Sequence, residues 1–453
     1  MDKQKCAGCA VGCVPFDSVP HLCHIETTYQ CNSDCIFCYN PEREKPINTS
    51  LIDRVVRSVA ASQIPHVYLI GGEPSMLGVE KLNEYIELLS DHSSVTIVTN
   101  GRITLRGISP RLACFGVPLH GATAEAHDFI TRRPHSFDQA LRSIDYYVGQ
   151  GHDVRCIPVL TGYNAHEIYD IIRIAVEHGM ESIFVDRYED GGIGAQHSVN
   201  DPRLKPTMDQ FRDAVTQMLR AREDFPQLGG RVGFGTAIPY CIDERLIREG
   251  MTANCGVGST FCAINPSGDV RLCNQSQLVF GNVLLESLEA IWQQRSLDTF
   301  RDLSWVEEPC RSCPLLDECV CGCKVDANCS DRFCIDYAVR GLIKPPIDVS
   351  VIQPTATTEV SFPEAYRQFF VNRYTKILDR HPERFLVTRY QTVTLNDGAL
   401  EVLRAIIDKR LLTEQSVITY FADEIPEPEL RRAISLFIRA GALDETEVTH
   451  AGT

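Results

Sequence analysis

Three cysteines lie close together in the stretch Cys31-Asn-Ser-Asp-Cys35-Ile-Phe-Cys38, directly after an apolar segment that we expect to be a strand over residues 22–29. Three thiolates on one tight loop can bind three corners of a four-iron cluster and leave the fourth iron open to a small molecule. Zinc prefers four closed ligands and C-x2-C pairs, so a zinc loop is the less favoured interpretation. The stretch therefore predicts a redox cofactor at the end of a first strand.

Short apolar runs alternate with amphipathic ones from about residue 21 to residue 240. The runs predicted as buried strands are residues 66–70, 95–99, 114–119, 154–160 and 183–186. Helical patterns cover residues 51–61, 80–89, 137–148 and 165–178. With the strand before the cysteine loop they make six βα units, which predict an α/β fold with parallel strands and helices outside. The cysteine loop then lies at the C-terminal strand ends, where active sites of such folds are built.

The CxxxCxxC spacing followed by an aromatic residue, here Tyr39, resembles the signature of the radical S-adenosylmethionine (SAM) enzymes. In that family the open iron of a 4Fe–4S cluster binds SAM, and one electron cleaves SAM to a 5′-deoxyadenosyl radical. Two later loops agree with the resemblance. Gly71-Gly72-Glu73-Pro74 is similar to the GGEP motif that contacts the SAM amino group, and Thr99-Asn100-Gly101 is similar to the TNG motif. Pro118 replaces the family's usual serine, so no contact is transferred to that loop.

The resemblance implies a partial (β/α)6 radical SAM barrel over residues 21–240. It implies a SAM-binding 4Fe–4S cluster held by Cys31, Cys35 and Cys38. The SAM contacts that it implies are Tyr39, Gly71, Gly72, Glu73, Pro74 and Asn100. It assigns no catalytic residue.

Residues 241–340 hold a second group of cysteines. Cys255 is followed by twelve residues, Gly268, four residues and Cys273, and the run C-x2-C-x5-C-x3-C begins at Cys310. This spacing resembles the SPASM domain, the cysteine-rich extension of radical SAM enzymes that modify peptides and proteins. Two auxiliary 4Fe–4S clusters are implied, with ligands Cys255, Cys262, Cys273 and Cys323 for the first and Cys310, Cys313, Cys319 and Cys334 for the second. Cys329 is the alternative to Cys334, and a structural zinc ribbon is the alternative to both clusters.

The remaining cysteines are divided between two interpretations. Residues 1–20 form a cysteine-containing N-terminal segment, in which Cys6, Cys9 and Cys13, with Cys23 beyond it, could bind a further cluster or zinc. Packed or mobile thiols explain the same four residues equally well. Cys114 and Cys156 stand inside apolar strands, where a free cysteine is usually part of the core.

The C-terminal part reads as a linker over residues 341–358 and a small α+β module over residues 359–453. Residues 384–390 and 391–395 are predicted as hairpin strands, and helices are predicted after Asn396, over 413–421 and over 430–440. This order resembles the winged-helix, leader-peptide-binding domain typified by the small chaperone of pyrroloquinoline quinone synthesis. A winged helix for dimerisation or DNA binding is the alternative, although no helix is strongly basic.

Composition restricts the remaining possibilities. The chain has 453 residues, 44% hydrophobic residues and a net charge of −16, which argues against nucleic acid as the main partner. No run of eighteen apolar residues and no signal-peptide core is found, so we expect a cytoplasmic protein without a membrane span. In a reducing compartment twenty cysteines are more readily metal ligands than disulfides.

These features predict a radical SAM/SPASM maturase, an oxidoreductase that forms a thioether or carbon–carbon crosslink in a ribosomally made peptide. The expected partners are a peptide substrate with a leader and an electron donor such as flavodoxin or ferredoxin. Asn274 replaces the aspartate that serves as base in sulfatase-modifying relatives, which disfavours that reaction. Peptide decarboxylation, epimerisation, and modification of a small molecule or tetrapyrrole remain alternatives. An iron–sulfur electron carrier with a regulatory winged helix is the non-enzymatic alternative, but a carrier needs neither the GGEP nor the TNG loop.

Overall fold

The computed structural model describes residues 17–40, 42–191, 194–325, 333–348, 366–380 and 383–445. Cys6, Cys9, Cys13 and Cys329 lie outside these residues, and the predicted linker is described only as far as residue 348.

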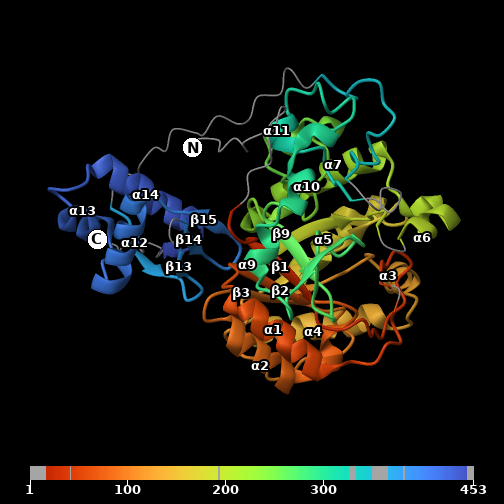
Figure 1. Cartoon of the computed structure of the whole chain (residues 1–453), viewed down its shortest axis with the longest axis horizontal. Helices are drawn as coiled ribbons and strands as arrows, with labels where there is room; N and C mark the ends of the chain where they lie inside the picture. The colour runs from red at the N-terminus through yellow and green to blue at the C-terminus, as the bar shows by residue number, and fades with distance from the viewer. Residues whose placement is uncertain are drawn as a thin grey trace.

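A single large sheet contains parallel strands arranged in chain order (Figure 1). They are β1 (Leu22–Glu26), β2 (His66–Ile70), β3 (Ser94–Val98), β4 (Cys114–Val117), β5 (Val154–Cys156) and β7 (Ser182–Arg187). Two short strands, β6 (Val159–Leu160) and β8 (Val232–Phe234), also pair in parallel with β7. The predicted partial (β/α)6 barrel is therefore confirmed.

Two predicted strands are shorter in the structure than expected, and a proline accounts for each difference. The predicted strand over residues 154–160 is two strands, β5 and β6, with Pro158 between them. The strand predicted to reach residue 119 ends at Val117, directly before Pro118. Proline has no backbone N–H to donate to a sheet, so a strand cannot continue through it with full pairing.

Helices follow most strands and cover the outside of the sheet, as α1, α2 and α4 do in Figure 1. They are α1 (Thr49–Ala61), α2 (Val79–Leu89), α3 (Ala124–Thr131), α4 (Ser136–Gly149), α5 (Ile168–Glu177), α6 (Gly194–Asn200) and α7 (Met208–Asp224). Helix α1 buries Ile52, Val55, Val56 and Val59, an apolar stripe with helical spacing that packs on the core. Among the described residues, no helix combines the length and the apolar character that crossing a membrane requires.

The cysteine-rich region continues the same sheet. Strand β9 (Phe261–Ile264) pairs in parallel with β1, and β10 (Asp269–Arg271) returns beside it and pairs with β11 (Val279–Asn282). The predicted hairpin is present, and Gly268 closes its turn with φ +88°. Short helices flank the hairpin. Helix α8 (Arg245–Arg248) precedes it, and α9 (Leu288–Trp292), α10 (Asp298–Arg301) and α11 (Leu316–Cys319) come after it.

The C-terminal module has its own core and two small sheets. Its elements are β12 (Phe369–Val371), β13 (Lys376–Arg380), β14 (Glu383–Val387), β15 (Thr392–Thr394), α12 (Asp397–Lys409), α13 (Glu414–Tyr420), α14 (Glu427–Arg439) and β16 (Leu443–Glu445). The predicted hairpin and three helices are present, and Asn396 caps α12 by accepting a bond from the Ala399 N–H at 2.8 Å. Strand β13, which extends the hairpin to three strands, was not predicted.

The module packs against the N-terminal ends of the barrel strands, opposite the cysteine loop (Figure 1). Ser94, the first residue of β3, donates to the Arg389 carbonyl at 3.0 Å. Arg389 itself pairs with Asp153, just before β5, at 3.0 Å. Tyr374 donates to the carbonyl of Leu112, just before β4, at 3.2 Å. These contacts fix the module at the end of the barrel that active sites of such folds do not use.

Candidate functional site

The cysteine loop is held in place by backbone bonds to its neighbours. Cys31 donates its N–H to the Arg43 carbonyl at 3.2 Å, and Ile36 donates to the Ile130 carbonyl of α3 at 3.0 Å. Two sulfur atoms already accept backbone N–H groups, Cys31 from Ser33 and Cys38 from Asn40, each at 3.4 Å. These two N–H groups would stabilise negative charge on the sulfur atoms of Cys31 and Cys38.

The electrostatics of the loop explain why it needs a metal. Burial raises the pKa of Cys31 to about 12, and burial raises the pKa of Cys35 further, with added repulsion from Cys38 and Cys31. Burial also raises the pKa of Cys38, although Arg43 opposes this shift. Three half-buried thiols with raised pKa values would lose their protons on binding a metal, because ligation itself deprotonates a thiol. The donor set thus fits an iron–sulfur cluster.

The two glycines of the GGEP motif let its loop pack against the start of the cysteine loop. A Cβ on Gly71 would lie 2.4 Å from the Thr28 carbonyl oxygen, and one on Gly72 would lie 2.2 Å from the Gln30 carbonyl oxygen. Both distances are impossible for a side chain. The close approach that these glycines permit is therefore to protein backbone, and their predicted contact with SAM stays a prediction.

Glu73 joins the GGEP and TNG loops. Its Oε1 accepts bonds from the Thr99 hydroxyl at 2.5 Å and the Ser75 N–H at 2.9 Å, and its Oε2 accepts from the Asn100 N–H at 2.8 Å. The Asn100 amide donates in turn to Asn32 in the cysteine loop at 2.6 Å. The three predicted motifs therefore meet at one place. A ligand ammonium would have to share a carboxylate that already accepts these protein bonds.

Tyr39 points to the inside of the barrel. Its hydroxyl donates to Glu26 Oε1 at 3.0 Å, and burial raises the pKa of Tyr39 well above its usual value. Glu26 also pairs with Arg271 of β10 and accepts from the Asn274 amide at 2.9 Å. The structure thus places Tyr39 in a network that connects β1 to the SPASM-like hairpin. Sequence reasoning missed Glu26 and Arg271, which no local motif marks.

Both polar atoms of the Asn274 amide make hydrogen bonds. Its Nδ2 donates to Glu26, and its Oδ1 lies 2.7 Å from Nδ1 of His24. Burial lowers the pKa of His24 to about 4, so the ring is neutral at neutral pH and can donate its Nδ1–H to this oxygen. The arrangement offers no free base at this position.

Three of the four cysteines predicted for the first auxiliary cluster lie together. The nearby charges of Cys255 and Glu189 add to the burial that raises the pKa values of both Cys273 and Cys323. Cys262 is placed differently. It is in register with Cys23 on the neighbouring strand, and both side chains are fully buried there. A hydrogen bond with Cys262 adds to the burial that raises the pKa of the Cys23 thiol.

Three of the four cysteines predicted for the second auxiliary cluster line one apolar pocket, together with two that were not predicted. The cysteines around it are Cys241, Cys310, Cys313, Cys319 and Cys321. Repulsion from Cys319, Cys310 and Cys313 adds to the burial that raises the pKa of Cys241. Cys334 forms a disulfide and would have to be reduced before it could bind iron, so its role as the last ligand stays a prediction.

A strained turn separates the two auxiliary groups. Val320, Cys321 and Gly322 all have positive φ, at 47°, 65° and 71°. Such a conformation is costly for the β-branched Val320 and persists only where its surroundings hold it. The turn lies between Cys319, which faces the second group, and Cys323, which faces the first. It explains how neighbouring residues can serve two different sites.

Within the part of the chain that the structure describes, no set of three or more histidine, cysteine or acidic side chains is arranged to hold a single metal ion. The ligands of a four-iron cluster are spread more widely, because each thiolate binds a different iron. Cys114 and Cys156 are buried in the barrel core, as predicted.

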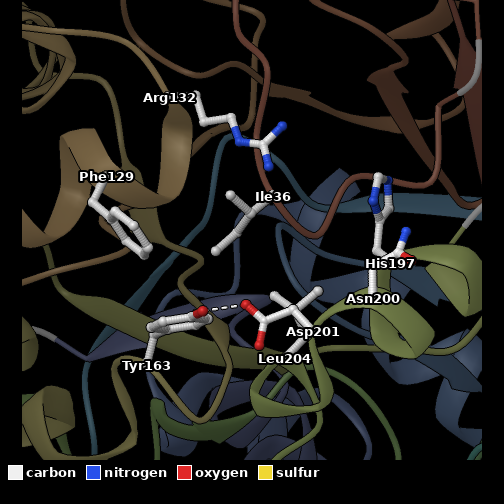
Figure 2. A pocket seen from close by; sticks show the side chains of 8 residues that line it. All are labelled: Ile36, Phe129, Arg132, Tyr163, His197, Asn200, Asp201 and Leu204. Carbon is white, nitrogen blue, oxygen red and sulfur yellow. Dashed lines mark hydrogen bonds between the residues drawn. The ribbon is translucent and has the colours of Figure 1, made fainter.

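A cavity of about 250 Å³ lies beside the cysteine loop. It is lined by Ile36, Phe129, Arg132, Tyr163, His197, Asn200, Asp201 and Leu204. Figure 2 shows Ile36 between α3 and the segment that carries Asp201, whose carboxylate accepts a bond from Tyr163. Polar and charged side chains make up most of its lining, and the cavity offers room for part of a substrate next to the predicted cluster.

Two segments match known families. Residues 25–175 match the radical SAM superfamily, and residues 255–314 match the SPASM family of iron–sulfur cluster-binding domains. The first contains the cysteine loop with the GGEP and TNG motifs, and the second contains the hairpin and the first cysteines of the second group.

Similar proteins include a maturase and a peptide cyclase. The chain is 27% identical over 320 residues to the mycofactocin maturase MftC of Mycolicibacterium smegmatis, which covers 66% of this chain and 76% of MftC. It is 24% identical over 334 residues to the PqqA peptide cyclase of Methylocella silvestris, covering 68% and 86% of the two chains. Among solved structures, Streptococcus suis SuiB bound to its precursor peptide SuiA shares the fold, with a TM-score of 0.51, 17% identity and coverage of 72% and 77%.

Proposed function

The chain joins a radical SAM domain to a SPASM domain, and we propose that it uses them to modify a ribosomally made peptide. Such domains use SAM and 4Fe–4S clusters, which supply a carbon-centred radical when the protein is loaded. The observation that carries the proposal is the meeting of the cysteine, GGEP and TNG loops through Glu73 and Asn100. The relatives support the peptide substrate, because one is named a peptide cyclase, another is named a maturase, and SuiB is seen bound to a precursor peptide.

The proposed product is a crosslink, such as a thioether or a carbon–carbon bond. Asn274 supports this choice over a side-chain oxidation that needs a base at this position. Both polar atoms of its amide are hydrogen-bonded, to Glu26 and His24. We infer that the barrel positions the peptide carbon and excludes water, while the chemistry comes from the cofactors. A flavodoxin or ferredoxin would supply the electron, in the cytoplasm.

The proposed role of the C-terminal module is to bind a leader peptide. Strand β13 pairs only with β14 among the described residues, so its outer edge can accept an added strand. Beside it lies a cavity of about 350 Å³ lined by Asp379, Arg384, Asp397, Leu400, Glu401 and Arg404. Because the module sits opposite the cysteine loop, a bound leader would have to extend along the barrel before the core peptide reaches the cluster. This favours a long precursor over a small molecule.

A charge reversal beside β13 tests this role. Arg404 is half-exposed and pairs with Asp379 at 2.7 Å. We expect Arg404→Glu to raise the Michaelis constant for a full-length precursor, taken from a short reading frame beside the gene, by about tenfold or more. Uncoupled cleavage of SAM should be unchanged, because its site lies at the other end of the barrel.

Lys409→Glu on the same helix is the matched control, since Lys409 is exposed and does not line the cavity. It should leave the Michaelis constant unchanged. Equal turnover of precursor by Arg404→Glu and the parent protein would make the module a dimerisation or stability element. It would also reopen the small-molecule alternative.

A further inference from the structure

The first auxiliary group lacks its fourth predicted thiolate because of strand geometry. Side chains alternate between the two faces of a strand. Phe261 of β9 packs edge-on against His24 with ring centroids 4.6 Å apart, on the face where His24 meets Asn274. Cys262 therefore lies on the opposite face, in register with Cys23. There it packs beside Cys23 in the core of the sheet.

Glu189 lies beside Cys323, one of the cysteines predicted for the first auxiliary cluster. It follows β7, and its Oε1 lies 3.5 Å from the sulfur of Cys323. Its charge also acts on Cys273, so the carboxylate lies near enough to both cysteines to affect them. Among the described residues, Glu189 makes no ion pair and is half-buried, and the nearby charge of Arg187 is shared with Asp336. A half-buried carboxylate whose neighbouring cation pairs with another group would gain from metal coordination.

The surrounding structure fixes Glu189 against these cysteines. Two residues on, Gly191 packs so closely on Gln275 that a Cβ would lie 2.3 Å from the Gln275 Cβ. On the other side, Arg187 pairs with Asp336 at 2.9 Å, and Asp336 accepts the Cys323 N–H at 2.9 Å. The end of β7 is therefore tied to the segments of both Cys273 and Cys323.

We propose that Glu189 is the fourth ligand of the first auxiliary cluster, through a carboxylate oxygen, and that Cys262 is not a ligand. The proposal rests on the cluster content of the proposed function and is independent of its peptide substrate. Iron–sulfur clusters prefer thiolate ligands, so the iron bound by Glu189 should be the one most readily lost. Replacing the anionic ligand by a neutral amide should raise the midpoint potential of this cluster, because potentials rise as the net negative charge falls.

The test uses the full chain with Cys31, Cys35 and Cys38 changed to alanine, so that only auxiliary clusters remain. After anaerobic reconstitution this parent should hold about eight irons. Cys273→Ser should lose about four of them, whereas Cys262→Ser and Cys262→Ala should keep about eight. Glu189→Gln should change the EPR spectrum of one reduced cluster, raise its midpoint potential and show a three-iron signal after oxidation.

Asp186→Asn is the control, because Asp186 is a similarly half-buried carboxylate on β7 that acts on Glu189 only through its charge. This variant should leave the EPR spectrum unchanged and shift the midpoint potential less than Glu189→Gln does. The proposal is overturned if both Cys262 variants lose about four irons, or if Glu189→Gln matches its parent in spectrum and potential. Iron near zero in the parent itself would instead refute the auxiliary clusters of the proposed function.

Discussion

The two ends of the barrel differ in the residues and contacts that build them. At the C-terminal strand ends, glycines, buried thiols and Glu73 bring three loops together through backbone contacts and short side chains. At the N-terminal ends, Arg389 and Tyr374 of the C-terminal module reach across to the starts of the strands. The first end is suited to hold a cofactor rigidly, and the second to attach a separate folded unit. The difference implies that chemistry and recruitment can be disrupted independently.

The C-terminal strand ends, which carry the cysteine loop, are called the cluster end below. The largest effect should come from removing the three thiols of this end. We expect the triple change Cys31→Ala, Cys35→Ala and Cys38→Ala to abolish formation of 5′-deoxyadenosine from SAM, because no other described group can hold that cluster. Binding of a precursor to the module should persist. The measurement is chromatography of the SAM products under a strong reductant. Cys114→Ala, which removes a core thiol, is the control and should keep the activity.

Retained SAM cleavage in the triple variant would contradict the radical assignment. Loss of peptide binding in the same variant would contradict the separation of the two ends.

The cluster end could be predicted from the sequence because its signals are local. The spacing of Cys31, Cys35 and Cys38 and the GGEP and TNG loops are each contained in a few residues. The module's secondary structure was predicted for the same reason. Its position was not, because Arg389 and Asp153 are 236 residues apart in sequence and no motif marks either residue. The side to which Cys262 points was missed because spacing does not specify the face of a strand.

A second effect at the cluster end should come from Gly72→Ala. The new Cβ would lie 2.2 Å from the Gln30 carbonyl, so the GGEP loop or the cysteine loop must move. We expect a loss of about 1–3 kcal/mol in unfolding free energy, as for overpacking, and at least a tenfold drop in SAM cleavage. Gly149→Ala at the end of α4 is the control, since nothing lies within 4 Å of its added Cβ. Equal activity of the two variants would show that the loop contact is unimportant.

A third, smaller effect should come from the module end. Arg389→Ala leaves the buried Asp153 without its partner, which should cost about 1–3 kcal/mol of stability. SAM cleavage should be unaffected. The matched control is Arg373→Ala, because Arg373 also stacks on Tyr374, at 4.8 Å against 4.4 Å for Arg389, yet it makes no pair with Asp153. Thermal unfolding of the two variants separates the ion pair from the stacking. A lower SAM cleavage rate in Arg389→Ala would show that the two ends are coupled.

The smallest effect is the pH dependence of that loss. Burial raises the pKa of Asp153 above its usual value, while Arg389 lowers it. Without Arg389 the folded-state pKa rises further, so the folded variant binds its proton more tightly than the parent does. A raised carboxyl pKa favours the folded state below the unfolded value of about 3.9 and disfavours it increasingly as pH rises toward the folded value. The stability difference between Arg389→Ala and the parent should therefore be small in acid and grow toward neutral pH. Unfolding midpoints measured across this range give the difference directly, and one that stays constant with pH would mean that Asp153 does not carry the docking energy.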